Sequence, residues 1–135
     1  MPSENVELAH LAYEVAYVRR SLEGFEERFT DDFTWHQRAE WPGRAAYPRD
    51  ELTALWEDLD ATYSEFTLEP VEFAEIGDSV LVTVHTSARL RTSDHRIDGT
   101  IWHVWRFRDA RLAEVRVYSD HQEALNAAQQ PEEGG

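Results

Sequence analysis

Residues 99–125, GTIWHVWRFRDARLAEVRVYSDHQEAL, contain two strand-like runs and the beginning of a helix. The runs cover 100–108 and 112–118, and a short Arg-Asp-Ala-Arg turn separates them. Ser119-Asp120 follow the second run, and Glu123-Ala124-Leu125 then indicate a helix. The segment therefore predicts a β-hairpin that leads directly into a terminal helix.

One face of the first of these strands combines an imidazole with large apolar side chains. Side chains alternate along a strand, which places Ile101, His103, Trp105 and Phe107 on the same side. A histidine in such surroundings suits proton transfer in a half-buried pocket. It is equally what a core histidine with satisfied hydrogen bonds would look like, and the pattern alone does not separate the two interpretations.

The N-terminal part of the chain is predicted to be helical. Apolar residues recur at spacings of three and four from Leu8 to Phe29, which is typical of an amphipathic helix. Ser3-Glu4-Asn5 supplies residues suited to an N-cap, and Gly24 predicts a bend or a break into a second short helix.

The middle of the chain mixes short elements. We expect a turn at 30–32, an aromatic strand over 33–37 and an irregular loop over 38–47. A further helix, capped by Asp50, is predicted to run through Leu59.

From residue 64 onward the apolar residues follow the period of strands. Candidate strands cover 66–74 and 80–91, with turns at 76–79 and 92–95. Helices followed by an antiparallel meander predict an α+β fold, in which N-terminal helices cover one face of a curved antiparallel sheet.

Length and composition point to one globular domain. The 135 residues form a single expected unit, 1–135, with a core at about 4–128 and a frayed tail over 129–135. An excess of 27 acidic over 13 basic residues gives a net charge of −14, which argues against nucleic-acid binding. No run of about 18 apolar residues predicts a membrane span, and the lack of cysteine fits a cytoplasmic protein.

The sequence contains no recognisable cofactor motif. The histidines lack the paired spacing of a zinc site, and there is no glycine-rich phosphate loop. We therefore expect neither a metal ion nor another cofactor.

Several local strings resemble the SnoaL-like branch of the nuclear transport factor 2 (NTF2)-like superfamily. They are ENVE at 4–7, FTDDFTWH at 29–36, FRDARL at 107–112, and YSD at 118–120 with EAL at 123–125. The order of the predicted elements agrees with this resemblance. It implies a cone-shaped sheet covered by helices, in a superfamily that includes polyketide cyclases, ketosteroid isomerase and limonene epoxide hydrolase. Since one fold serves many reactions, the resemblance does not fix the chemistry.

The resemblance implies catalytic roles for two residues of the terminal segment. Asp120 corresponds to an acid/base aspartate at the end of the last strand, and an apolar environment would raise its pKa. The alternative is an N-cap for the terminal helix, since aspartate is a favoured cap. His103 corresponds to the hydrogen-bond donor of an oxyanion hole in ketosteroid isomerase, while a core histidine is the alternative.

Further residues are placed near the site by the same resemblance. Tyr13 corresponds to the phenolic donor of the isomerase in an ungapped register, and Tyr17 lies one helical turn away; the alternative is that both tyrosines pack in the core. Gln37 occupies the position of the isomerase's general base, yet an amide cannot accept a proton at useful pH. The expected catalytic set is thus Asp120, His103, Tyr13 and Gln37. The expected substrate-binding set is Trp35, Trp56, Trp105, Tyr17 and Phe107.

These features lead to two functional hypotheses, beside that of a pure dimerisation module. The first is a cofactor-independent enzyme that performs proton-transfer chemistry (cyclisation, isomerisation, dehydration or hydration) on a small hydrophobic organic molecule. The second is a non-catalytic binding or accessory protein with the same pocket. A homodimer through the sheet is expected, with Trp102 and His85 on the face away from the pocket.

Overall fold

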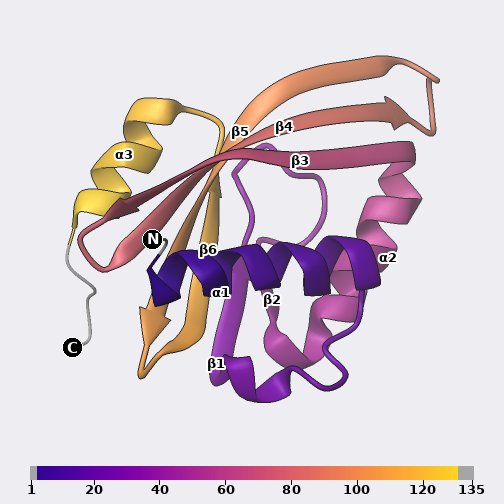
Figure 1. Ribbon diagram of the computed structural model, residues 1–135. Helices are drawn as coiled ribbons and strands as arrows, with labels where there is room; N and C mark the ends of the chain where they lie inside the picture. The colour runs from indigo at the N-terminus through magenta and orange to yellow at the C-terminus, as the bar shows by residue number, and fades with distance from the viewer. Residues whose placement is uncertain (1–2, 131–135) are drawn as a thin grey trace.

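The computed structural model describes residues 3–130 and has a six-stranded sheet with helices on both of its faces (Figure 1). The elements in chain order are α1 (Glu4–Tyr13), η1 (a π-helix, Glu14–Arg19), η2 (Glu26–Arg28), β1 (Phe29–His36), β2 (Ala46–Pro48), η3 (Arg49–Glu51), α2 (Leu52–Thr62), β3 (Tyr63–Ile76), β4 (Ser79–Leu90), β5 (Arg96–Arg108), β6 (Arg111–Tyr118) and α3 (His121–Gln129). The predicted tail lies largely outside the described residues.

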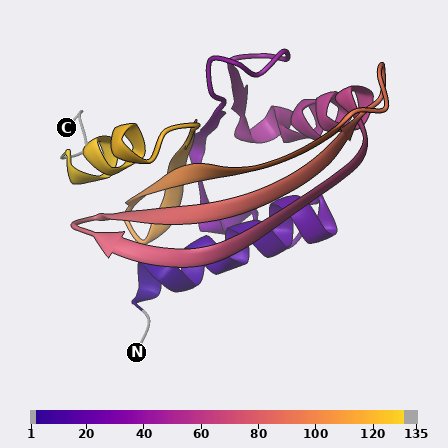
Figure 2. The ribbon, with the colours of Figure 1, turned by 90° about the horizontal axis from the view of Figure 1, so that it is seen from above.

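The sheet has the strand order β2-β1-β6-β5-β4-β3. Strands β3 to β6 form the predicted antiparallel meander, whereas β1 pairs with β6 in parallel. The long strands β3, β4 and β5 bend together, as Figure 2 shows from above. The α+β class, the curved sheet and its N-terminal helices are as predicted from the sequence.

The alternation along β4 and β5 separates two apolar cores. Val82 and Val84 pair with His103 and Ile101, and these side chains pack with α1 and α2 against the inner face. On the outer face, a smaller cluster packs around α3 and consists of Leu81, Val104, Ala124 and Ala128 with partly buried neighbours such as Trp102. His85 is exposed. The predicted facing of these strands is therefore confirmed.

The N-terminal helix is shorter than predicted. The α-helical part ends at Tyr13, a π-helical turn follows to Arg19, and Arg20 adopts the left-handed conformation with φ 51°. The apolar spacing that continues to Phe29 therefore belongs to a loop and a short 3₁₀ turn, and Phe29 already begins β1. Left-handed backbone at Arg20 ends the helix, which the apolar spacing could not indicate.

Two assignments in the middle of the chain need correction. Residues 30–32 lie within β1, where the pairing with β6 is irregular, instead of forming a turn. Asp50 lies in the 3₁₀ turn η3 and does not cap α2, whose N-terminal flanking residue is Glu51. The loop after β1 also contains the short strand β2, which pairs with β1. Short edge pairing of this kind leaves little pattern in the sequence.

None of the helices formed by residues 3–130 is both long and apolar enough to cross a membrane.

Candidate functional site

A narrow cavity lies between the inner face of the sheet and the helices. Its lining comes from seven segments and consists of Tyr17, Gln37, Arg38, Trp41, Leu59, Tyr63, Phe66, Leu68, Thr86, Ala88, Ile97, Ile101, His103 and Val117. The lining is mostly aromatic and aliphatic, with a few polar groups among them. This composition is typical of sites for small organic molecules.

The cavity measures about 60 Å³. That is below the ~300 Å³ at which ligand pockets usually begin. A ring-containing ligand would therefore have to displace lining side chains. Ile97, on β5 at the rim of the cavity, is 43% exposed, so the lining reaches solvent there.

His103 belongs to a buried hydrogen-bond relay at the side of this cavity. The Trp105 indole donates to the Tyr13 hydroxyl at 3.0 Å, and that hydroxyl lies 2.6 Å from His103 Nδ1. Among the described residues, Nδ1 is the acceptor found for the hydroxyl proton of Tyr13. The relay therefore assigns the neutral tautomer of His103 in which Nε2 carries the hydrogen.

Burial keeps the groups of this relay neutral. Desolvation, followed by the positive charge of Arg38, lowers the pKa of His103 from 6.5 to about 3. Desolvation raises the pKa of Tyr13 well above its usual value, although the hydrogen bond from Trp105 acts in the opposite direction. At neutral pH His103 is thus an uncharged donor and a poor base.

The tryptophans predicted to line the cavity lie elsewhere. Trp35 and Trp105 are buried in the core beside His103, with ring centroids 5.5 and 6.2 Å from it. Phe107 is also buried in the core, and Trp56 lines a separate hollow beside Arg20 and Arg49. Strand alternation gives the face of a residue but not its depth below the helices, so it could not separate lining from packing.

Tyr17 and Gln37 both line the cavity. Tyr17 stacks on Tyr13 with ring centroids 6.1 Å apart, and desolvation raises its pKa. Tyr13 itself is buried in the core and joins the site through His103. Of the predicted catalytic set, the structure therefore brings Tyr13, His103 and Gln37 together.

Asp120 is not among the residues that line the cavity. Its carboxylate accepts a hydrogen bond of 3.0 Å from the backbone N–H of Glu123 at the N-terminus of α3, and its side chain is exposed. This is the geometry of an N-cap, the alternative that the sequence left open. Because the carboxylate is in solvent, the structure does not support the predicted acid/base role.

Replacing Asp120 separates the two roles directly. We expect Asp120→Asn to retain stability, because asparagine caps helices about as well, and Asp120→Ala to lose about 0.5–2 kcal/mol. Urea unfolding of both variants measures this. Equal losses in the two variants would show that the cap is not what Asp120 provides.

The loop between β1 and β2 supplies cavity residues that no sequence pattern indicates. Trp41 and Arg38 from this loop line the cavity. The hydroxyl of Tyr47 holds the loop: it accepts from Trp41 Nε1 at 2.9 Å and donates to Asp58 Oδ2 at 2.6 Å. In the sequence, Trp41 is simply an aromatic residue in a loop rich in proline and glycine. Such a position does not reveal whether the side chain points into a cavity.

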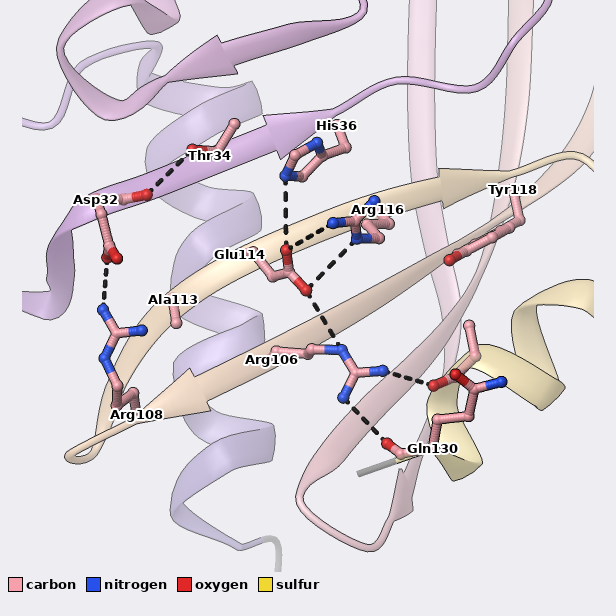
Figure 3. Close-up of a pocket in the computed structure, with 11 residues that line it drawn as sticks. Asp32, Thr34, His36, Arg106, Arg108, Ala113, Glu114, Arg116, Tyr118 and Gln130 are labelled. Atoms are coloured by element: carbon pink, nitrogen blue, oxygen red, sulfur yellow. Dashed lines mark hydrogen bonds and ion pairs between the residues drawn. The ribbon is translucent and has the colours of Figure 1, made fainter. Parts of the chain in front are cut away.

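A wider, open groove lies on the outer face of the sheet (Figure 3). Its volume is about 550 Å³, and its lining is largely charged. Glu114 lies at its centre with His36, Arg106 and Arg116 around it, at 3.3–3.5 Å. Arg106 also donates to the carbonyl oxygen of Ala127, at 2.6 Å.

These interactions give the outer groove a structural role in attaching α3 to the sheet. Arg106 links β5 to the last turn of α3, and Glu114 holds Arg106 in place. Burial, followed by the charge of Arg116, lowers the pKa of His36. Within residues 3–130, no cluster of three or more histidine, aspartate or glutamate side chains could hold a metal ion.

Solved structures with this fold include proteins of several kinds. An NTF2-like protein of unknown function from Burkholderia pseudomallei is 22% identical, with a TM-score of 0.73, and the match covers 96% of this chain and 100% of that one. A putative SnoaL-like polyketide cyclase from Jannaschia sp. is 16% identical, with a TM-score of 0.65 and coverage of 96% and 94%. A protein with a ketosteroid isomerase-like fold from Catenulispora acidiphila, in complex with trimethylamine, is 14% identical, with a TM-score of 0.66 and coverage of 93% and 94%.

The curved sheet with helices over its inner face defines an NTF2-like α+β protein, related in fold to polyketide cyclases and isomerases. The family model of the SnoaL-like domain matches residues 10–115, and the chain belongs to that family. No curated protein matches its sequence.

Proposed function

We propose that the protein binds a small hydrophobic organic molecule in the inner cavity and donates a hydrogen bond from His103 Nε2 to an oxygen of that molecule. The supporting observation is the relay from Trp105 through Tyr13 to His103 Nδ1. Because Nδ1 is occupied, Nε2–H is the ring's remaining polar group, and His103 lines the cavity.

A fixed donor of this kind stabilises negative charge on a carbonyl oxygen. Tyr13 and Trp105 hold the imidazole in place, so little reorganisation is needed when an oxyanion develops. The low surrounding polarity strengthens the interaction. Both effects favour reactions that pass through an enolate, and the reaction we propose is a cofactor-independent proton transfer such as an isomerisation, cyclisation, dehydration or hydration.

The proton acceptor in this proposal is water. Within the described chain, the residues that line the cavity include no aspartate or glutamate. Gln37 lies in the lining and can orient a water molecule through its amide, although it cannot take the proton itself. Catalysis would thus rest on stabilising the oxyanion rather than on a strong protein base.

The second candidate is a binding protein without turnover. The neutral His103 and the absence of a carboxylate among the described lining residues favour it specifically. Both candidates share the cavity and the donor, and they differ in whether a bound ketone exchanges protons.

Acetophenone, a small aromatic ketone, provides a test. We expect it to quench tryptophan fluorescence saturably, and His103→Phe to weaken its binding about tenfold, since a hydrogen bond of about 1–1.5 kcal/mol is lost. His95→Phe makes the same chemical change at an exposed position in the turn between β4 and β5 and should leave binding unchanged. Equal affinity of the wild type and His103→Phe would contradict the donor role.

Proton exchange then distinguishes the two candidates. An enzyme should accelerate deuterium incorporation into the methyl group of acetophenone in D₂O, as followed by ¹H NMR, and His103→Phe should abolish the acceleration. Binding without any accelerated exchange would favour the non-catalytic candidate.

We also propose that the protein forms a homodimer through the part of the outer sheet face that α3 leaves uncovered. Thr83 and His85 of β4 lie there, whereas Trp102 stacks on His121 of α3 with ring centroids 5.3 Å apart. Light scattering at micromolar concentration should give twice the mass of the chain, and Thr83→Asp should shift the protein toward the monomer. A monomeric wild type would contradict the proposal.

A further inference from the structure

Arg38 is a half-buried cation in the lining of an otherwise uncharged cavity. Among residues 3–130, no carboxylate lies within 4.0 Å of its guanidinium group. Arg20 pairs with Asp60 at 2.9 Å and Arg49 with Asp31 at 3.4 Å, whereas other described arginines, such as Arg28, also have no carboxylate within 4.0 Å. Among the described arginines, Arg38 is distinguished by its place in the lining of the cavity.

The charge of Arg38 acts on the interior of the site. It contributes to lowering the pKa of His103 and opposes the rise in the pKa of Tyr17. The acidic residue next in sequence, Glu40, is turned to its own backbone N–H and to Ser119, and these bonds, more than Arg38, lower its pKa. Glu40 lines an outer hollow that Arg38 also borders, but it does not line the cavity. Arg38 thus contributes a positive potential that the other lining residues do not neutralise.

We propose that the ligand of the cavity is an organic anion, whose carboxylate or acidic enol oxygen pairs with Arg38 while its apolar part lies among the aromatic side chains. This inference rests on the proposed function, because it assigns a charge to the ligand of that same cavity. A guanidinium group offers paired N–H donors that fit a carboxylate, and such charge-assisted bonds are about twice as strong as neutral ones.

Selectivity for an anion would have to come from the site itself. The net charge of −14 disfavours the approach of any anion, so general attraction to the protein surface would give the opposite preference. Arg38 is partly buried, so salt should screen its attraction to a bound anion less than it screens ion pairs on the surface. If the protein binds an anion more tightly than a neutral molecule of the same shape, a positively charged group in the cavity must therefore be responsible.

Benzoate and acetophenone form a matched pair for this test, because they share the ring and differ mainly in charge. We expect wild-type protein to bind benzoate at least fivefold more tightly than acetophenone at low ionic strength, with both affinities measured by fluorescence titration. Arg38→Met, which keeps most of the apolar stem, should weaken benzoate binding about tenfold and change acetophenone binding by less than twofold. Arg38→Lys should lie between the wild type and Arg38→Met.

Arg28→Met serves as the control, since it makes the same change in net charge at an exposed position outside the cavity lining. It should leave both affinities unchanged. Equal binding of the two ligands, or an equal loss of both in Arg38→Met, would overturn the assignment to an anion while leaving the cavity as a binding site. Saturable binding of neither ligand would overturn the proposed function and this inference together.

Discussion

Lowering the pH from about 7 to about 4.5 should reduce the free energy of unfolding by about 2–3 kcal/mol more in the wild type than in a His103→Gln variant. The pKa of His103 is about 3 in the folded protein, against an ordinary value of 6.5. The unfolded chain therefore takes up a proton below about pH 6.5, while the folded protein does not. Stability is lost as the pH falls, at about 1.4 kcal/mol per pH unit from this one group.

Urea unfolding at several pH values measures this difference. Glutamine at position 103 does not titrate, and its amide oxygen can accept the hydrogen bond from Tyr13. His95→Gln is the matched control, because it makes the same substitution at an exposed position outside the cavity, and the variant should show the wild-type pH dependence of stability. Parallel stability curves for the wild type and His103→Gln would mean that His103 is not held neutral by burial.

Gly43→Ala should be the most destabilising small substitution in the loop at the cavity, with an expected cost of about 2–4 kcal/mol. A Cβ at this position would overlap Trp41 Nε1 and would lie 2.7 Å from the Tyr47 hydroxyl and 3.0 Å from Asp58 Oδ2. These three groups form the hydrogen-bond network of the loop, so the methyl group would force the network apart. The loop carries Arg38, and acetophenone and benzoate affinity should fall as well.

Two comparisons isolate this effect. Gly99→Ala adds a methyl group where no atom lies within 4 Å, and it should change stability by less than about 0.5 kcal/mol. In a Tyr47→Phe background the network is already broken, so Gly43→Ala should cost clearly less there than in the wild type. A Gly43→Ala variant as stable as Gly99→Ala would contradict the role of the network.

The sequence predicted the meander and the inward face of β5 because a period of two depends only on local geometry. That same alternation placed His103 inside and Trp102 outside, and both positions are confirmed. It could not predict the parallel pairing of β1 with β6, which joins segments far apart in the chain.

The candidate site was predicted less completely than the fold. Tyr13 and His103 were identified, but their 2.6 Å contact depends on the packing of α1 against β5. An aspartate at position 120 fits a helix cap and a catalytic acid equally well in the sequence, and its hydrogen bond to the Glu123 N–H and its exposure distinguish the two roles. Arg38 was missed because a loop has no periodicity from which to infer where a side chain points.

The proposed function depends most directly on a neutral His103 whose Nε2–H donates a hydrogen bond to the ligand. Its ring nitrogens can be observed by long-range ¹H–¹⁵N NMR between about pH 4.5 and 7.5, with and without acetophenone. The account predicts a protonated Nε2 and an unprotonated Nδ1 throughout this range, and a downfield shift of the Nε2–H proton as acetophenone saturates the cavity. A doubly protonated ring at pH 5, hydrogen on Nδ1, or an Nε2–H signal that does not respond to saturating ligand would contradict it.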